Sequence, residues 1–285
     1  MPSGSRLVCS LLVALASCAA PEARREPSIA STNDRARLSA PATGEAPPPS
    51  ADPAPLAFIA SQRSLSELPV PGFLPALVYQ PAANEPRPLV VATHGAGGAP
   101  EGECAYWVRL TRGFSFVLCL RGTPFDRATL SSFYYKNHLE LRRELDAALG
   151  AARAAFGARL SPAGGLYSGF SQGATMGVGM IPALGAELPL LVLIEGGYDY
   201  WSVAQAKKYR ASGGRRVLFA CGTKWCADRS EKSAAWLRKV GIEARVEYAP
   251  GVGHTPMGEV MARVAEALPW VISENPGWEG LTGAR

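Results

Sequence analysis

The chain has 285 residues, of which 19% are charged and 47% are hydrophobic, and its formal net charge is +5. The positive charges are scattered over expected helix faces, as at Arg142, Arg143 and Arg153, and no basic stripe interleaved with aromatic residues occurs. Composition and charge therefore argue against a nucleic-acid-binding protein.

The first predicted element is an export signal over residues 1–17. Leu7–Ala16 is an apolar stretch too short to span a bilayer. It is followed by Ser17 and Cys18, and Leu-Ala-Ser-Cys resembles the lipobox of bacterial lipoproteins. That resemblance implies cleavage before Cys18, lipidation of Cys18 and attachment to the bacterial cell envelope, with Ala19 suggesting the outer membrane. An ordinary signal peptide with an incidental cysteine is the alternative.

The next segment, residues 18–55, is rich in Pro, Ala, Ser and Glu and has no apolar periodicity. Such a composition predicts a disordered tether that carries the lipidated Cys18 at its start. The remaining residues, 56–285, fit one domain of ordinary size.

Short apolar runs alternate with amphipathic segments through this domain. The expected strands are Leu77–Tyr79, Pro88–Thr93, Phe114–Leu120, Gly165–Tyr167, Leu188–Ile194, Arg216–Ala220 and Ala244–Tyr248. The expected helices are Tyr106–Arg112, His138–Phe156, Ala174–Met180, Arg229–Val240 and Gly258–Val271. This alternation predicts an α/β domain with a mostly parallel, doubly wound sheet and no large cap domain. The aromatic residues of segment 121–136 could line a cleft or pack against the core.

Four cysteines lie in the expected domain, and an even number in an exported protein favours disulfides. Three pairings are possible. We prefer Cys104–Cys119 and Cys221–Cys226, because the members of each pair lie close along the chain. A zinc site is the rival, and it is poorly supported because no second Cys-x-x-Cys or spaced His pair accompanies these cysteines. No metal and no cofactor is expected.

The most informative motif is Gly169-Phe-Ser171-Gln-Gly173, a G-x-S-x-G pentapeptide with Ser171 at its centre. Apolar residues precede it and a run of small and apolar residues follows, as expected of a strand–turn–helix. A nucleophilic serine needs such a sharp turn, and glycines on both sides remove side chains that would clash there. A glycine-rich turn with an exposed, inert serine is the alternative.

A nucleophilic serine needs a general base, and the chain has three histidines that are candidates for this base. His254 lies in a glycine-rich loop after an expected strand, from which its ring could reach the serine. His94 directly follows a buried strand in His-Gly-Ala-Gly-Gly, which resembles the HG-x-G loops of esterases that hold a developing oxyanion. On that resemblance we assign the oxyanion donors to the N–H groups of Ala96 and Gln172, and we expect His94 to be structural. We expect His138 to lie on the surface.

The order of the three motifs resembles the α/β-hydrolase superfamily over nearly all of residues 75–272. Gly-Phe-Ser-Gln-Gly is similar to its carboxylesterase/phospholipase and acyl-thioesterase group and to relatives of dienelactone hydrolase. The resemblance implies a mostly parallel eight-stranded sheet and a Ser–acid–His triad in that chain order. Dienelactone hydrolase itself uses a cysteine nucleophile, so Ser171 points to the serine branch.

The triad acid is where the chain departs from the family pattern. The family places Asp in the loop after the strand that matches Arg216–Ala220, but Trp225 occupies the usual position here, and Asp228 follows three residues later. Asp228 is the preferred acid, although it also matches a helix capping box. Glu195 is the alternative, because a charge that ends a strongly apolar strand needs a reason. Asp199 is a weaker third candidate.

The function expected from these features is cleavage of small-molecule carboxylic esters by an exported, lipid-anchored serine hydrolase. A thioesterase or peptidase is an alternative within the enzyme class. The displaced acid motivates a different class, a non-catalytic surface lipoprotein that keeps the fold for binding. The substrate and the oligomeric state do not follow from the sequence.

Overall fold

The computed structural model describes residues 64–282. The predicted signal segment 1–17, Cys18 and the tether 18–55 lie outside these residues, as do residues 56–63 of the expected domain. Within the described part, no helix is both long and apolar enough to cross a membrane.

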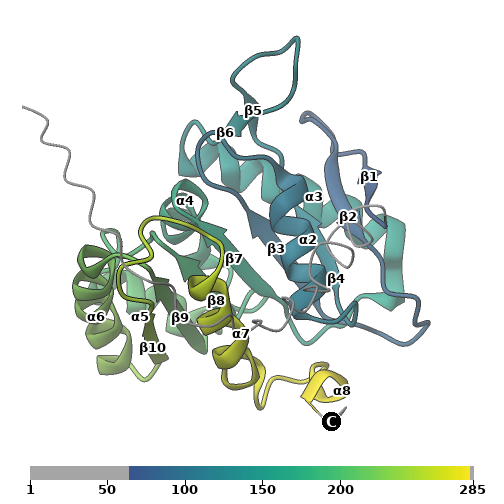
Figure 1. The fold of residues 1–285 in the computed structure, drawn as a ribbon. Helices are drawn as coiled ribbons and strands as arrows, with labels where there is room; N and C mark the ends of the chain where they lie inside the picture. Colours follow the sequence, from purple (N-terminus) through teal and green to yellow (C-terminus); the bar gives the residue numbers. More distant parts are fainter. Residues whose placement is uncertain (1–63, 283–285) are drawn as a thin grey trace, which may run out of the picture. The chain divides into compact units, whose positions relative to one another are not determined.

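A central eight-stranded sheet organises the described residues, in the order β1-β2-β4-β3-β7-β8-β9-β10 (Figure 1). Its strands are β1 (Ser66–Leu68), β2 (Ala76–Tyr79), β3 (Leu89–Thr93), β4 (Phe116–Cys119), β7 (Leu166–Phe170), β8 (Leu190–Ile194), β9 (Arg216–Cys221) and β10 (Glu243–Tyr248). β2 pairs antiparallel with β1 and β4, and the other pairs are parallel. The expected fold class is confirmed, and the carboxyl ends of the parallel strands share one edge.

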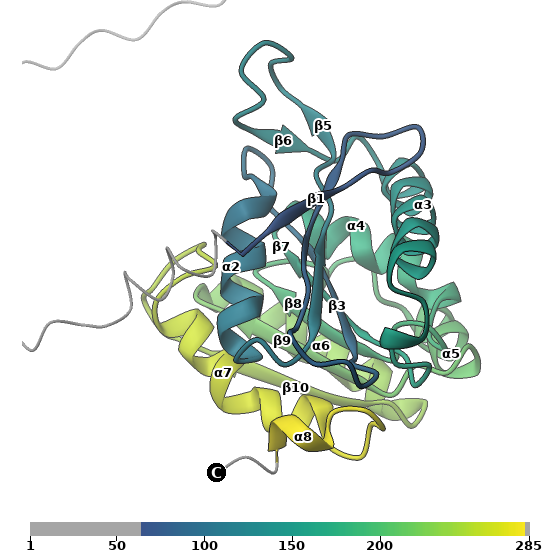
Figure 2. The ribbon, with the colours of Figure 1, turned by 90° about the vertical axis from the view of Figure 1, so that its right-hand side faces the viewer.

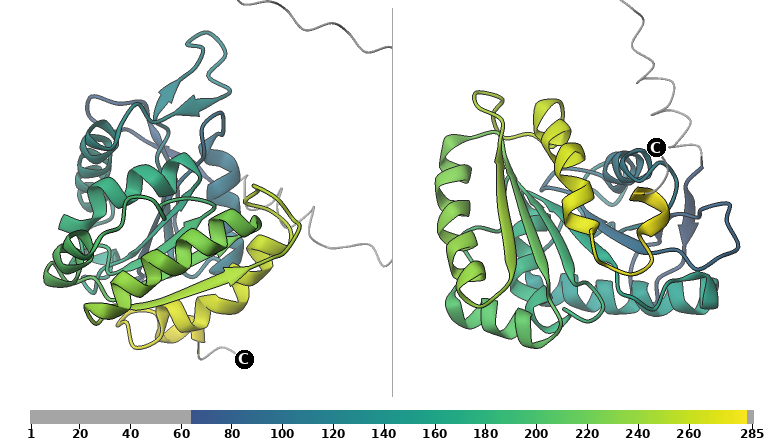
Figure 3. Two further views of the ribbon diagram at one scale, coloured as in Figure 1. Left: turned by 90° about the vertical axis from the view of Figure 1, so that its left-hand side faces the viewer. Right: turned by 90° about the horizontal axis from the view of Figure 1, so that it is seen from below.

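Helices cover both faces of this sheet. They are α2 (Pro100–Leu110), α3 (His138–Phe156), α4 (Gln172–Met180), α5 (Val203–Ala211), α6 (Lys224–Lys239), α7 (Glu259–Ile272) and α8 (Glu279–Thr282), with short 3-10 turns at Gly157–Arg159 and Ile181–Ala183. Figure 2 shows α2, α7 and α8 on one side of the sheet and α3, α4 and α5 on the other. The view from below in Figure 3 shows α6 on the side away from α7. The chain is therefore doubly wound.

The apolar strands are explained by burial on both faces. In β8, Leu191 and Leu193 join the core cluster formed with α3 to α6, whereas Leu190, Val192 and Ile194 join the cluster formed with α2 and α7. Successive side chains of a strand point to opposite faces, so a strand covered by helices on both sides must be apolar throughout.

The structure departs from the expected elements in several places: α6 begins at Lys224 rather than Arg229, and β1 and α8 were not expected. α2 begins at Pro100 rather than Tyr106, since proline is well accepted in the first turn of a helix. α5 was not predicted, because only Ala206 and Tyr209 of this helix are buried and its apolar pattern is correspondingly weak.

Segment 121–136 forms a small hairpin of β5 (Thr123–Pro124) and β6 (Phe133–Tyr134), which extends away from the sheet in Figure 1. Of its aromatic residues, Phe133 and Tyr135 are buried and pack against the core, which was one of the two expected alternatives. Tyr135 stacks on the His94 ring at 4.7 Å between centroids. Phe125 is exposed. No large cap is inserted within residues 64–282.

Candidate active site

Ser171 lies on a sharp turn between β7 and α4, at the carboxyl edge of the sheet. Its backbone has φ 49° and ψ −108°, a left-handed conformation that is costly for a residue with a side chain. A Cβ on Gly173 would lie 2.7 Å from the carbonyl oxygen of Thr93, and one on Gly169 would overlap the backbone of Ala174. The two glycines are therefore required by close approach of the backbone, as the motif predicts.

Buried hydrogen bonds hold this turn in place. The Tyr167 hydroxyl donates to the carbonyl oxygen of Gly173 at 2.7 Å, and it also contacts the Thr93 hydroxyl at 2.8 Å. The Thr93 hydroxyl in turn donates to the carbonyl of Ser168 at 3.1 Å. This network ties β3 and β7 to the first turn of α4, so that the strained conformation of Ser171 is imposed by its surroundings.

His254 meets Ser171 across the edge of the sheet. Its Nε2 lies 2.9 Å from the Ser171 Oγ, and its Nδ1 lies 3.1 Å from Oε2 of Glu195. The Phe170 ring packs against the imidazole at 5.2 Å between centroids. A neutral imidazole with its proton on Nδ1 satisfies both contacts, because Nδ1–H then donates to the carboxylate and Nε2 accepts from the serine hydroxyl.

Glu195 is the carboxylate that contacts His254. It directly follows β8 and is only 2% exposed. Oε1 accepts from the backbone N–H groups of Gly222 and Thr223, the latter at 3.0 Å, and Oε2 accepts from the Thr223 hydroxyl at 3.1 Å. A buried carboxyl group is costly without hydrogen-bonding partners, and these donors supply them at the side of Glu195 that faces His254.

The loop after β3 holds His94 through contacts of both its ring nitrogens. His94 is buried, and its two ring nitrogens contact the carbonyl oxygens of Gly95 at 2.7 Å and Arg121 at 2.9 Å. Burial lowers the pKa of His94, while these carbonyl contacts act in the opposite direction. His94 is thus occupied within the loop, as expected of a structural residue, and it does not contact Ser171. His138 is exposed, as expected.

The N–H groups of Ala96 and Gln172 are placed to act as donors. Within residues 64–282, neither donates to a backbone or side-chain acceptor, whereas Gly97 donates to Phe133 and Gly173 donates to His94. Gln172 is the first residue of α4, where the helix dipole favours negative charge. Gln172 directly follows Ser171, and Ala96 follows Gly95, where an added Cβ would lie 3.2 Å from the Cβ of Ser171. The assignment of both N–H groups as oxyanion donors stays a prediction.

Comparison with known proteins gives matches at the level of structure alone. No protein-family model matches the chain, and no curated protein matches its sequence. A dienelactone hydrolase-like promiscuous phosphotriesterase, P91, from metagenomic libraries matches with TM-score 0.56 and 18% identity, over 74% of this chain and 97% of its own. A carboxylesterase from Mesorhizobium loti matches with TM-score 0.54 and 16% identity, over 72% and 98%. The esterase PE8 matches with TM-score 0.51 and 20% identity, over 73% and 99%.

The chain has the α/β-hydrolase fold. Nearly the whole length of these solved structures is matched by the part of the chain that forms the sheet and its helices.

Asp228, the preferred acid from the sequence, does not contact His254. Its side chain is 60% exposed and pairs with Lys224 one helical turn away. It is also not a helix cap, because α6 already begins at Lys224 and is capped by the Thr223 side chain. Asp199, the third candidate, pairs with Arg229. The structure therefore replaces Asp228 by Glu195 as the carboxylate in contact with His254.

Thr223 is a site residue that the sequence analysis missed. Its hydroxyl donates to Glu195 and also accepts from the Cys226 N–H at 3.2 Å, so one side chain both caps α6 and holds the acid. A threonine directly before a helix is a recognisable capping signal. The hydrogen bond of Thr223 to Glu195 depends on the pairing of β9 with β8, and it has no signal in the sequence.

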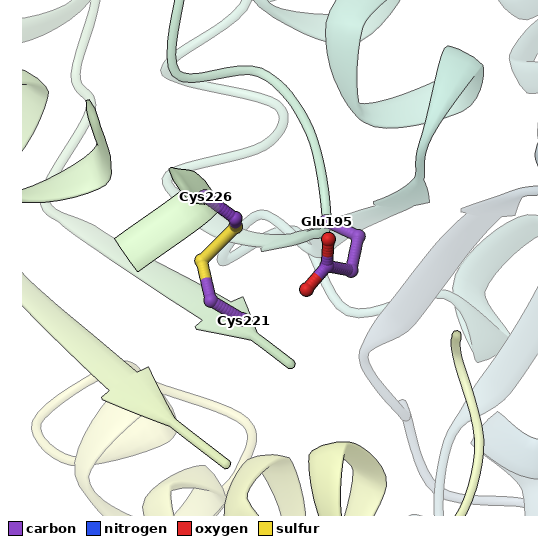
Figure 4. A group of neighbouring side chains, drawn as sticks. All are labelled: Glu195, Cys221 and Cys226. Atoms are coloured by element: carbon purple, nitrogen blue, oxygen red, sulfur yellow. A yellow bond between two sulfur atoms is a disulfide. The ribbon is translucent and has the colours of Figure 1, made fainter. Parts of the chain in front are cut away.

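Both expected disulfides are present. Cys104–Cys119 joins α2 to β4, and Cys221–Cys226 closes the loop between β9 and α6. Figure 4 shows the second bridge beside Glu195. Sulfur and carboxylate atoms of Glu195, Cys221 and Cys226 lie within 4.8 Å of one another, but the two sulfur atoms are bonded to each other and are not thiolate ligands for a metal.

The Cys221–Cys226 bridge encloses the donors that hold Glu195, so its loss is expected to lower activity as well as stability. Opening this short loop in Cys221→Ala/Cys226→Ala should cost about 2 kcal/mol of stability by loop entropy. Displaced Gly222 and Thr223 donors should lower kcat/KM by about tenfold or more, since small misplacements are costly at active sites. Thermal melts and ester kinetics, with and without dithiothreitol, measure both effects.

The matched control is Cys104→Ala/Cys119→Ala, whose bridge carries none of the hydrogen bonds of Glu195. It should lose stability, by about 3 kcal/mol on the same loop-entropy scale, but keep its kcat/KM at temperatures where it is folded. Equal losses of activity in the two double variants would show that the 221–226 bridge has no particular link to the acid.

Proposed function

We propose that this chain is a serine hydrolase that cleaves carboxylic esters through an acyl-enzyme. The observation that carries the proposal is the continuous hydrogen-bonded series from Ser171 through His254 to Glu195. Solved structures of the same fold that are described as esterases and carboxylesterases support the same reaction class.

In the first half of the reaction, the Ser171 Oγ attacks the ester carbonyl carbon while His254 Nε2 takes its proton. Glu195 stabilises the imidazolium that forms and keeps its proton on Nδ1. The carbonyl oxygen becomes an oxyanion, and the N–H groups of Ala96 and Gln172 would stabilise it more strongly than the ground-state carbonyl. Collapse of this intermediate expels the alcohol, which receives the proton from His254, and leaves Ser171 acylated.

In the second half, a water molecule gives its proton to His254 and attacks the acyl carbon. The second tetrahedral intermediate collapses to release the carboxylic acid, and Ser171 regains its proton from the imidazolium. The same two donors serve both intermediates. His254 is half exposed, with 51% of its side chain accessible, so water can reach the acyl-enzyme from the open side of the site.

The non-catalytic alternative rested on the absence of an acid from the expected loop position. Glu195 supplies a buried carboxylate within hydrogen-bond reach of His254, which removes the reason for preferring a binding role. A hydrolase with an intact relay and open donors is the better account of this arrangement.

Covalent labelling tests the proposal. A fluorophosphonate probe is expected to modify the folded protein, and peptide mass spectrometry should find the adduct on Ser171, because only an activated serine attacks such phosphorus centres at a useful rate. Heat-denatured protein is the control and should not be labelled. Absence of labelling in the folded protein, or an adduct on another serine, would contradict the proposed mechanism.

We further propose that the enzyme is exported and anchored to the bacterial envelope through a lipidated Cys18. The support is the lipobox-like Leu-Ala-Ser-Cys sequence after a short apolar stretch. A fatty-acid label should be incorporated into the wild-type chain in a bacterial host and not into Cys18→Ala. Equal incorporation into both chains would refute the anchor.

A further inference from the structure

Three acidic side chains are buried within residues 64–282, and one of them is unlike the others. Glu195 and Glu144 each accept several hydrogen bonds, those of Glu144 coming from the N–H groups of Arg121 and Gly122. Glu103 is 7% exposed, yet no hydrogen bond or ion pair to its carboxyl is found in the described part of the chain. A buried carboxyl without a partner is costly and calls for an explanation.

Glu103 belongs to the lining of a cavity of about 210 Å³, which also includes Gly95, where an added Cβ would lie 3.2 Å from the Cβ of Ser171. The cavity is also lined by Gly95 and Ala96 of the oxyanion loop, and by Phe170, which directly precedes Ser171. Pro256 and Met257, from the loop that carries His254, contribute to the same wall. Ester groups bound at Ser171 would therefore have one arm directed toward this cavity.

A role in stabilising α2 does not account for Glu103. Acidic residues in the first turn favour the positive end of a helix, but they do so from the surface without loss of hydration. Glu101 already provides this charge in the same turn, where 46% of its side chain is exposed and it lies 3.8 Å from Arg121. A second acid in the same turn gains little from the dipole when its side chain is buried.

We propose, on the basis of the ester hydrolase function above, that Glu103 is the polar recognition group of a substrate subsite that accepts a hydroxyl-bearing arm of the ester. The lining also includes Tyr106 and His94, and both ring nitrogens of His94 already contact the carbonyl oxygens of Gly95 and Arg121. Glu103 is the one carboxyl of this lining, and it would distinguish a hydroxyl group from a methyl group of the same size. Sites with a buried polar group discriminate against ligands that leave this group without a partner.

The choice of a hydroxyl over a cation follows from the state of the carboxyl. Burial raises the pKa of Glu103 to about 8, so the group is mostly protonated at neutral pH. A protonated carboxyl both donates and accepts a hydrogen bond, as a hydroxyl does, and the two are complementary. An ammonium group would require two charges to be buried together, at a considerable cost in hydration.

The test compares matched esters at pH 7. Methyl 3-hydroxypropanoate and methyl butanoate differ by hydroxyl against methyl on the acyl arm, and 2-hydroxyethyl acetate and propyl acetate differ in the same way on the alcohol arm. In one of the two pairs, the pair whose varied arm enters the cavity, wild type should have a kcat/KM about three- to tenfold higher for the hydroxyl ester, the usual range for one hydrogen bond. Glu103→Leu should remove this preference, and Glu103→Gln, which keeps a donor and an acceptor, should retain most of it.

Glu101→Leu is the matched control, because it removes an acid from the same helical turn outside the cavity, and its hydroxyl preference should equal that of wild type. An unchanged preference in Glu103→Leu, or no preference on either arm in wild type, overturns the subsite. A preference for methyl 3-aminopropanoate that Glu103→Gln removes would overturn the hydroxyl class in favour of a cation. Wild-type turnover of p-nitrophenyl acetate separates these results from a failure of the proposed hydrolase function.

Stability as a function of pH provides a readout that does not depend on turnover. The folded-state pKa of Glu103, about 8, lies above its ordinary value of 4.5, so the folded chain holds a proton that the unfolded chain releases between these values. Stability from this group is therefore lost as the pH rises from about 4.5 to 8. The difference in melting temperature, Glu103→Gln minus wild type, should therefore increase as the pH rises from about 4.5 to 8 and stay constant at higher pH. A difference independent of pH would contradict an unpartnered carboxyl.

Discussion

Ser171→Ala is expected to lower kcat for ester hydrolysis by about 10⁵- to 10⁶-fold, the scale of nucleophile removal in serine hydrolases. The variant keeps the oxyanion donors, so a small residual rate above the uncatalysed reaction should remain. Folding should be little affected, because alanine can take the place of a serine whose hydroxyl bonds only His254 among the described residues. Rates with p-nitrophenyl acetate and a thermal melt measure the two quantities.

The hydrogen-bonded series Ser171–His254–Glu195 also predicts that the losses of activity from single substitutions in it are strongly non-additive. His254→Ala alone should cost nearly as much as Ser171→Ala, and the double variant should be no slower than the slower single variant, because the two residues act as one unit. Multiplicative losses in the double variant would mean that Ser171 and His254 contribute independently, which is incompatible with proton transfer between them.

Glu195→Gln is expected to lower kcat/KM by about 10³- to 10⁴-fold, whereas Asp228→Asn should stay within about twofold of wild type. The neutral amide that replaces the Glu195 carboxylate cannot stabilise an imidazolium. It would also place its own N–H groups against the N–H and hydroxyl donors of Gly222 and Thr223, which now bind the carboxylate. Asp228 is exposed and pairs only with Lys224 on the surface, where such pairs contribute little. Steady-state kinetics of both variants on one ester give the comparison.

A melt at the assay pH is needed as the control for Glu195→Gln, because the change leaves buried hydrogen-bonding groups mismatched and should also lower stability. Activity is therefore compared at a temperature where both variants are folded. A large loss in Asp228→Asn with near-normal activity in Glu195→Gln would reverse the assignment of the acid.

The secondary structure was predictable where burial is strong. The run Leu188–Ile194 is apolar on both faces and became β8, and α3 spans the predicted residues His138–Phe156, because its apolar positions recur at helical spacing. α5 escaped prediction because it buries few side chains, and its sequence therefore carries little periodic signal. The apolar pattern of a sequence predicts a helix or strand only where that element buries enough apolar side chains to make the pattern regular.

The acid could not be chosen from the sequence, because the choice depends on which strands are neighbours. β8 and β9 pair in parallel with Ile194 opposite Ala220, so Glu195 lies beside the backbone that follows β9. The donors at Gly222 and Thr223 come from that backbone. A family pattern that places the acid after the matching strand favoured Asp228, but α6 begins before Asp228 and carries its side chain to the surface.

The sequence by itself determined the α/β class and the sharp turn at Ser171, and it indicated the loops of His94 and His254 and a preference among three cysteine pairings, because each depends on residues close together along the chain or on a repeating pattern of burial. The tertiary structure decided which carboxylate stands behind His254 and that Glu103 lines a cavity beside Ser171. Both depend on contacts between segments far apart in sequence, which strand order and helix packing fix and which no local spacing encodes.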